Sequence, residues 1–291
     1  MSSFSDSQSP PAAAPSLEGI AIVGMAGRFP GAETLSAFWE NLTAGRETIS
    51  TIPVEEIPTE ENKLDPDYVP RRGVLEKPEW FDAAFFNINP REAEVIDPQQ
   101  RLFLESCQHA LEDAGCDPSR YPGAIGVYAG MSNSSWVQHQ ILPNAELRAQ
   151  FGYEGTMIAN EKDYLATRTA YKLNLRGPAL NIYTACSTSL VAVCQAVQAL
   201  QSYACDAALA GGVSVKWPQH RGYTAQEGSL YSPDGHCRPY DADSRGTVFS
   251  NGLGVVLLKR LEDAVREGDH VWAVIKGAAL NNDGGGKASF T

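Results

Sequence analysis

The sequence predicts an α/β protein with largely parallel sheets. Short apolar runs of strand length alternate along the chain with segments that have the apolar periodicity of helices, and glycine or proline separates many of them. The 291 residues are 43% hydrophobic and 20% charged, which is typical of a globular domain and excludes a coiled coil or a collagen-like repeat. A chain of this length can bury one large core or two small ones.

The N-terminal part is predicted to contain a tail, a strand and a helix. Residues 1–17 are rich in Ser, Pro and Ala and are expected to be disordered. Residues 20–24 form an apolar run that ends in glycine, which predicts a strand buried on both faces. A loop over residues 25–32 then leads to a helix with one apolar face. That face comprises Leu35, Phe38, Trp39 and Leu42.

The middle of the chain combines an irregular segment with a well-marked helix. Residues 46–95 carry turn residues and scattered aromatics, which predicts a long excursion over the surface. In the helix that follows, Asp97 is suited to the cap, Pro98 to the first position and Gly115 to the stop. Residues 124–130 are the next apolar strand. The apolar face of the helix comprises Phe103, Cys107, Ala110, Leu111 and Ala114.

The alternation continues to the end of the chain. Residues 163–173 predict a helix and residues 179–183 a strand. Residues 187–202 predict a helix that is apolar almost all round, so we expect it inside the protein. The remaining elements are strands at 207–210, 252–258 and 271–277 and a short helix at 261–267.

Charge and hydropathy exclude several classes of function. The formal net charge is −12, because 35 acidic residues outnumber 23 basic ones. Nucleic acid is therefore not expected as a partner, since a duplex-binding protein needs a positive surface to displace counterions. No run of 18 apolar residues is present and the N-terminus lacks the features of a signal peptide. We expect no membrane association and a cytoplasmic location.

The cysteines predict neither disulfides nor a metal site. They show no Cys-x-x-Cys pair and no metal-finger spacing, so reduced thiols are expected, most of them buried. The six are Cys107, Cys116, Cys186, Cys194, Cys205 and Cys237.

Cys186 is the candidate catalytic residue. It lies in Thr-Ala-Cys-Ser-Thr-Ser (184–189), between a predicted strand and a predicted helix. Free backbone N–H groups and the positive end of the helix dipole at such a junction favour the thiolate, and the Cys186 N–H is available to a developing oxyanion. An acyl hydrolase is disfavoured, because its turn would read Gly-x-Cys-x-Gly. A buried cysteine that only fills space is the remaining alternative.

The segment at residues 181–190 resembles the active-site segment of β-ketoacyl synthases, the ketosynthase domains of modular polyketide synthases and of hybrid peptide–polyketide lines. The resemblance covers about residues 18–291. It implies a thiolase-like, layered αβαβα fold and, in most members, a homodimer. Six further segments match the family in the same order: 20–30, 97–105, 205–213, 226–238, 246–259 and 281–287.

The resemblance also implies a mechanism. Cys186 takes an acyl group from the phosphopantetheine arm of an acyl carrier protein, and no cofactor is bound. A malonyl-type extender on a carrier protein then loses CO2, and its enolate attacks the thioester to give a β-ketoacyl product. The alternative from another class is a non-catalytic, ketosynthase-like interaction subunit.

One departure from the family concerns the histidines. Members carry one in His-Gly-Thr-Gly-Thr and one in Asn-x-Gly-His, with a lysine nearby, and neither segment occurs here. We therefore expect residues 18–268 to be an N-terminal ketosynthase region and residues 269–291 the start of a truncated C-terminal region. The missing half is then an expected partner for condensation. The histidines present are His109, His139, His220, His236 and His270.

Other departures and candidates are minor. Tyr183 and the run at 187–189 differ from the residues of many relatives, which leaves the preferred acyl group open. Residues 24–27 lack a nucleotide-binding fingerprint, and residues 281–283 are expected to form a solvated loop. The local basic groups are either solvated surface or contacts for an acidic carrier protein. They are Arg71, Arg72, Arg168, Lys172 and Arg176.

Overall fold

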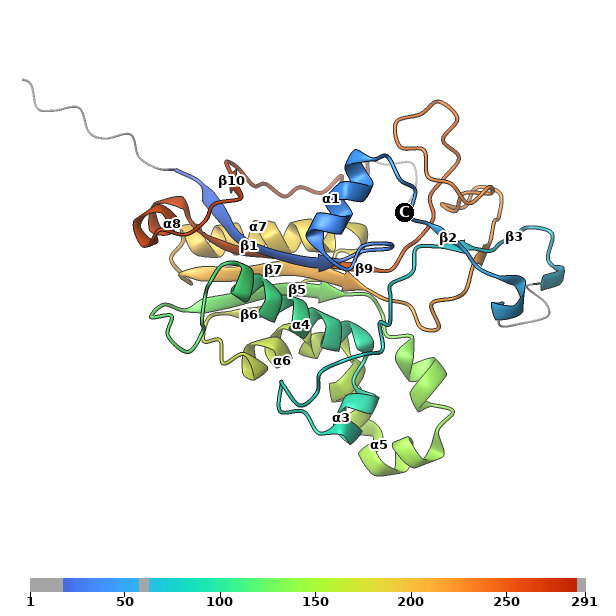
Figure 1. Ribbon diagram of the computed structural model, residues 1–291, viewed down its shortest axis with the longest axis horizontal. Coiled ribbons are helices and arrows are strands. Elements are labelled where there is room, and N and C mark those ends of the chain that lie inside the picture. Colours follow the sequence, from blue (N-terminus) through green and yellow to red (C-terminus); the bar gives the residue numbers. More distant parts are fainter. Residues whose placement is uncertain (1–17, 58–62, 287–291) are drawn as a thin grey trace, which may run out of the picture.

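The computed structural model describes residues 18–57 and 63–286, and the tail predicted at 1–17 lies outside them. The described residues form a six-stranded sheet with helices on both faces (Figure 1). The strand order is β10-β1-β9-β7-β5-β6. The strands are β1 (Ile20–Arg28), β5 (Ile125–Met131), β6 (Ala179–Asn181), β7 (Ala207–Ser214), β9 (Gly252–Arg260) and β10 (Ala273–Ile275).

The sheet is mixed, so the expectation of a largely parallel sheet is wrong. β5 runs parallel to β6 and β7, but β9 is antiparallel to both β7 and β1, and β1 is antiparallel to β10. After β7 the chain makes the excursion 215–251 and returns beside the strand it left, with Ser214 opposite Gly252. Such a wide hairpin reverses direction, whereas a parallel return needs a crossover to the far end of the strand.

The helices cover the sheet from two sides. Alternate residues of β7 point to opposite faces, as the pleat requires. Ala207 and Leu209 join the larger core beneath α4 (Pro98–Asp113) and α6 (Leu165–Lys172). Ala208 and Ala210 join a smaller core beneath α7 (Thr188–Gln201). Figure 1 shows α4 and α6 on one side of the sheet and α7 on the other.

Local signals located the ends of two helices correctly. The Asp97 carboxylate accepts a hydrogen bond of 2.7 Å from the Gln99 N–H, with Pro98 in the first position of α4. Gly115 follows that helix with φ +62°, a conformation that glycine adopts without strain. The second helix, α8 (Leu261–Glu267), has the predicted bounds and stops at Gly268.

Two predicted apolar faces are not covered in the described part of the chain. α7 is not enclosed inside the protein, because Leu190 is 71% exposed while Ala192 on the opposite side is buried. In α1 (Leu35–Thr43), Trp39 and Leu42 are mostly exposed and Asn41 is the buried residue. Periodicity identifies the apolar stripe of a helix correctly but does not tell which neighbour covers it.

The structure extends one predicted strand and contains helices and strands in segments for which none were predicted. β1 extends four residues beyond Gly24, because it pairs with β9 as far as Arg28. The segment predicted as irregular, residues 46–95, contains α3 (Pro90–Val95). It also contributes to two small sheets, which pair β2 (Ser50–Thr51) with β4 (Arg71–Arg72) and β3 (Tyr68–Val69) with β8 (Tyr223–Thr224). After β5 the chain forms a π-helical turn (Val137–Ile141) and α5 (Ala145–Asn160).

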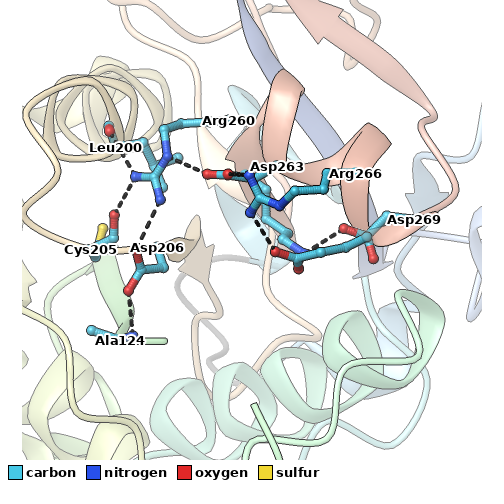
Figure 2. A network of polar contacts seen from close by, with 10 residues as sticks. Ala124, Leu200, Cys205, Asp206, Arg260, Asp263, Arg266 and Asp269 are labelled. Carbon is cyan, nitrogen blue, oxygen red and sulfur yellow. Dashed lines mark hydrogen bonds and ion pairs between the residues drawn. The ribbon is translucent and has the colours of Figure 1, made fainter. Parts of the chain in front are cut away.

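A polar network fastens the end of β9 to its neighbours (Figure 2). The Arg260 guanidinium donates to the backbone oxygen of Cys205 at 2.8 Å and to the Asp206 carboxylate at 2.9 Å. Asp206 in turn accepts from the Ala124 N–H at 2.8 Å, next to the start of β5. Arg260 also pairs with Asp263 in the first turn of α8. The network therefore joins the start of β5, the start of β7 and α8.

Candidate active site

Cys186 lies in a single 3-10 turn (η4, Ala185–Ser187) between β6 and α7. The predicted strand-to-helix junction is therefore present, although β6 ends at Asn181, two residues earlier than expected. The Cys186 side chain is exposed. A thiol in this position is open to a substrate and lies two residues before the first residue of a 14-residue helix.

Hydroxyl groups hold the turn around Cys186. The Ser187 Oγ donates to the Thr184 backbone oxygen at 2.9 Å and contacts the Thr184 Oγ1 at 3.0 Å. The Thr188 Oγ1 accepts from the Thr184 N–H at 3.0 Å. Ala185 has φ +53°, a left-handed conformation that is rare for a residue with a Cβ. These hydrogen bonds explain how the chain makes a sharp turn without the glycines of a hydrolase elbow.

Glycines in the neighbouring strands let this turn approach the sheet. A Cβ on Gly130 in β5 would lie 2.2 Å from the Thr188 Cγ2 and 2.3 Å from the Ile182 oxygen. A Cβ on Gly212 in β7 would lie 3.2 Å from the Ser189 Cβ. The chain on both sides of Cys186 is thus seated on the carboxyl ends of β5 and β7. Sequence reasoning missed both glycines as site residues, because their role depends on partners far away in the chain.

The side chains next to the turn are polar and aromatic. The Lys162 Nζ lies 4.5 Å from the ring centroid of Tyr183, which is three residues before the thiol. Burial and the neighbouring Asp163 raise the pKa of Tyr183, so its phenol stays neutral at physiological pH. Lys162 also donates to the Asn133 side chain at 3.4 Å.

The six cysteines are free thiols. The expectation that most of them are buried is wrong, since only Cys107 and Cys205 are. Cys186 and Cys237 are exposed, and the remaining two are partly exposed. Burial raises the pKa of Cys107, so that thiol is not poised to react.

The histidines named from the sequence contact residues other than Cys186. The Nδ1 atom of His236 is 2.8 Å from Glu47, and that of His220 is 2.5 Å from Glu56. The ring of His270 packs edge-on against Trp272, and His109 is exposed on α4. Within the described ranges, no hydrogen bond or ring contact connects a histidine with Cys186.

Two of the predicted basic residues, Arg168 and Arg71, are paired with other residues of the protein. Arg168 is not solvated surface, because its Nε donates to Gln100 at 2.7 Å and its side chain is only 12% exposed. Arg71 pairs with Glu47 at 2.9 Å. Periodicity placed Arg168 on a helix but could not show that α6 turns this residue towards α4.

A groove lies elsewhere on the described part of the chain. It has a volume of about 1420 Å³ and runs between α1, the far part of β1 and α4, with Trp80 and Trp272 at its margin. Among residues 18–57 and 63–286, no group of three or more His, Cys, Asp or Glu side chains is arranged to hold a metal ion. No helix in those ranges combines the length and apolar character needed to cross a bilayer.

Comparison with known proteins identifies the family. The family described as "Beta-ketoacyl synthase, N-terminal domain" matches residues 17–264. A phenolphthiocerol/phthiocerol polyketide synthase protein of Mycobacterium tuberculosis is 48% identical over 281 residues, which are 93% of this chain and 19% of that protein. A hybrid PKS-NRPS synthetase of Cordyceps militaris is 40% identical, over 93% of this chain and 17% of its own length.

Solved structures agree with this result. Ketosynthase twelve of the bacillaene polyketide synthase of Bacillus amyloliquefaciens has a TM-score of 0.86 at 35% identity and covers 94% of this chain. The module 6 ketosynthase of the bacillaene synthase of Bacillus subtilis 168 has a TM-score of 0.75 at 38% identity. This chain spans just under half of those structures, 48% and 44% respectively.

The chain belongs to the β-ketoacyl synthase family and contains its N-terminal domain. Its fold is the thiolase-like fold of the polyketide ketosynthases, as the sequence resemblance implied. The described residues supply one sheet with helices on both faces, which is one αβα part of that layered architecture.

Proposed function

We propose that this chain is the N-terminal part of a ketosynthase of a polyketide assembly line and that Cys186 is its nucleophile. The observation that carries the proposal is an exposed thiol in a turn seated on the carboxyl ends of β5 and β7, within a ketosynthase fold. A thiol that only fills space would be enclosed by side chains, as Cys107 is.

The first step is acyl transfer. The Cys186 thiolate attacks the carbonyl carbon of an acyl thioester on the phosphopantetheine arm of an acyl carrier protein. The bond to the pantetheine sulfur breaks, and that sulfur leaves as a thiolate, which takes up a proton from solvent in place of the one that Cys186 released. In this proposal the backbone N–H of Cys186 donates to the oxyanion of the intermediate, a contribution worth roughly 3 kcal/mol in a dry site.

The second step is decarboxylative condensation. A malonyl-type extender, held on a carrier protein, loses CO2, and its carbanion attacks the acyl carbon on Cys186. The sulfur of Cys186 leaves and the β-ketoacyl product stays on the carrier. The two histidines that the family uses in this step occur in segments that this sequence lacks. Condensation therefore requires a second polypeptide region.

In this proposal the partners are an acyl carrier protein, a C-terminal ketosynthase half and a second copy of the complete enzyme. Residues 18–268 form the N-terminal region and residues 269–291 begin the C-terminal one. No bound cofactor is needed, because the substrates arrive on phosphopantetheine. The exposed apolar side of α7, including Leu190, supports an additional protein layer over that helix.

The test of Cys186 is mass spectrometry after incubation with an acyl-pantetheine thioester. We expect one acyl adduct, located on Cys186 and lost in Cys186→Ala. Cys237→Ala is the matched control, because Cys237 is the other exposed thiol. It should keep the adduct.

The result that contradicts the proposal is a chain without an adduct, or equal labelling of Cys186 and Cys237. A silent Cys186 in a folded chain supports the second candidate, a non-catalytic interaction subunit. The observation in favour of that candidate is the same uncovered apolar side of α7, which is suited to bind a partner without any chemistry at the thiol.

A further inference from the structure

Three cationic residues lie on segments next to the carboxyl end of β7. Arg72 ends β4, and Lys216 and Arg221 lie in the segment that follows β7. We call these three residues the basic cluster. Lys216 and Arg221 are exposed or partly exposed, and Arg72 is partly buried.

Backbone hydrogen bonds hold these segments together. The Lys216 N–H donates to the Asn251 side chain at 2.9 Å, and the Asn251 N–H donates to the Gly73 oxygen at 2.9 Å. Lys216 is thereby tied to the residue after Arg72. On the other side, the Gly222 N–H donates to the Tyr68 hydroxyl at 2.7 Å. Arg221 therefore lies beside the strand that leads to Arg72.

The basic cluster has no anionic partner among the described residues. No ion pair involves Arg72, Lys216 or Arg221 there, and the buried Arg72 Nε lacks a hydrogen-bond acceptor. The neighbouring carboxylates are already engaged, Glu47 with Arg71 and His236, and Glu56 with His220. In a chain with a net charge of −12, three cations on neighbouring segments that pair with no described carboxylate need another explanation.

The charge of Arg72 is repelled by that of Arg221 and by that of Lys216. Burial lowers the pKa of Arg72, and the charge of Arg221 lowers it further. Burial and Arg72 lower the pKa of Lys216. The charge of Asp97 raises the pKa of Lys216. Asp97 is a buried carboxyl that caps α4, however, and is not available to neutralise the basic cluster. A bound anion would remove this repulsion.

The basic cluster lies on the same side of the sheet end as the proposed nucleophile. The Lys216 Nζ donates to the Asn133 backbone oxygen at 3.3 Å, and Lys162 contacts the side chain of the same residue. Lys162 in turn covers the ring of Tyr183, three residues before Cys186. Figure 1 shows the segments of β2 and β3 beyond this end of the sheet.

We propose that Arg72, Lys216 and Arg221 bind the phosphate group of the thioester substrate whose acyl end reacts with Cys186. This inference rests on the proposed function. A phosphate suits the cluster because its oxygens accept charge-assisted hydrogen bonds from arginine and lysine, and arginine donates two of them in parallel. The hydroxyls of Tyr68 and Tyr231 lie near Arg72 and supply neutral donors.

The test compares two soluble probes, an acyl-phosphopantetheine thioester and the acyl-pantetheine thioester without the phosphate. The rate of Cys186 acylation is measured by mass spectrometry, at low probe concentration, for wild type and for Arg72→Gln, Lys216→Gln and Arg221→Gln. We expect each substitution to slow acylation by the phosphorylated probe about tenfold, the factor for one lost charged contact. Acylation by the probe without phosphate should not change.

Arg176→Gln is the matched control. Arg176 is also exposed and has no ion pair among the described residues, but it precedes β6, at the opposite end of that strand from Cys186. It should leave both rates unchanged. Arg221→Gln is the variant least able to disturb folding, because Arg221 is exposed, and circular dichroism confirms the fold of each variant.

Equal losses with both probes would overturn the inference, because the cluster would then act without the phosphate. So would losses seen only when the substrate is attached to a carrier protein, which would indicate recognition of an acidic protein surface. Titration calorimetry of Cys186→Ala with unacylated phosphopantetheine separates this inference from the proposed function. Binding that Arg221→Gln abolishes supports the phosphate site even if Cys186 is never acylated. Equal affinity for inorganic phosphate would contradict its assignment to the substrate.

Discussion

Ala185 has a strained backbone conformation next to the proposed nucleophile. It precedes the proposed nucleophile and has φ +53° although it is not glycine. Residues held in this region store about 1–3 kcal/mol, which the surrounding hydrogen bonds must offset. Here those bonds come from Thr184, Ser187 and Thr188. The exposed thiol is thus presented by a turn that local side chains keep in place.

We expect Ala185→Val to lower the free energy of unfolding by about 1–2 kcal/mol, because a β-branched side chain fits a positive φ poorly. Ala185→Gly should change it by less than about 1 kcal/mol, since the relief of strain is offset by the greater freedom of the unfolded chain. Urea unfolding followed by circular dichroism measures both. Equal stability of the two variants would show that the turn is not strained at this residue.

Residues with a strictly local role were predictable from the sequence. Asp97 caps α4 and Gly115 ends it, because capping depends on positions only a few residues away. The inward orientation of Arg168 and the close approach of Gly130 to Thr188 were not predictable. Their partners are tens of residues distant, and only the packing of whole elements brings them together.

At the scale of elements, the contact between β5 and the start of α7 decides where Cys186 lies. Gly130→Ala would place a methyl group 2.3 Å from the Ile182 oxygen, so the turn must move. We expect a loss of stability of about 1–3 kcal/mol and a clear decrease in the rate of Cys186 acylation. Urea unfolding and mass spectrometry measure the two effects.

Gly277→Ala is the control for that substitution. Gly277 has no heavy atom within 4 Å of an added Cβ and does not have a positive φ. It should leave stability and acylation close to wild type. A Gly130→Ala chain that is acylated at the wild-type rate would contradict the proposed seating of the turn.

A second element-scale feature is the buried ammonium of Lys259 in β9. Its side chain is 5% exposed and pairs with Glu267 and Asp269, which follow in α8 and the next loop. Burial alone would lower the pKa of Lys259, but the hydrogen bonds to Asp269 and Glu267 raise it above its usual 10.5. The pKa of Lys259 is therefore higher in the folded chain than in the unfolded chain. Its ion pairs stabilise the fold fully below the unfolded-state pKa, and this stabilisation is lost as the pH rises through the folded-state pKa.

Lys259→Met should therefore destabilise the chain by about 3 kcal/mol at pH 8, because two carboxylates lose their cation. The difference from wild type should begin to shrink above about pH 10.5, where the lysine of the unfolded chain loses its charge, and should be lost above the higher pKa of Lys259 in the folded chain. Urea unfolding at several pH values measures the trend. The control is Arg266→Met, which removes an exposed cation of α8. Its stability should be like that of wild type at every pH. A Lys259→Met effect independent of pH would contradict the argument.

At the scale of the whole molecule, the two sides of the sheet are covered unequally. α4 and α6 cover a large core on one side, whereas α7 covers a small one and leaves Leu190 71% exposed. The second sheet of a thiolase-like fold would account for this asymmetry, because it packs against the same helix layer. In the proposed function, the C-terminal ketosynthase half supplies that second sheet.

We expect the chain to bind a separately produced C-terminal ketosynthase half and the mixture to form a β-ketoacyl product. Leu190→Asp should weaken binding strongly, because a carboxylate would enter the apolar contact of α7. Val265→Asp, which changes an exposed apolar residue of α8, should not. Titration calorimetry and product analysis are the measurements. A mixture without product, where the joined chain makes it, would refute assembly in trans.

The sequence alone determined the order of the main strands and helices, the ends of α4 and the location of Cys186 between β6 and α7. Those features depend on apolar periodicity, caps and motifs that extend over a few residues. Three features became visible in the folded chain: β9 runs antiparallel to β7, α7 keeps an exposed side, and the segments of the basic cluster come together. Each of these depends on contacts between distant segments, and a local pattern does not specify its partner.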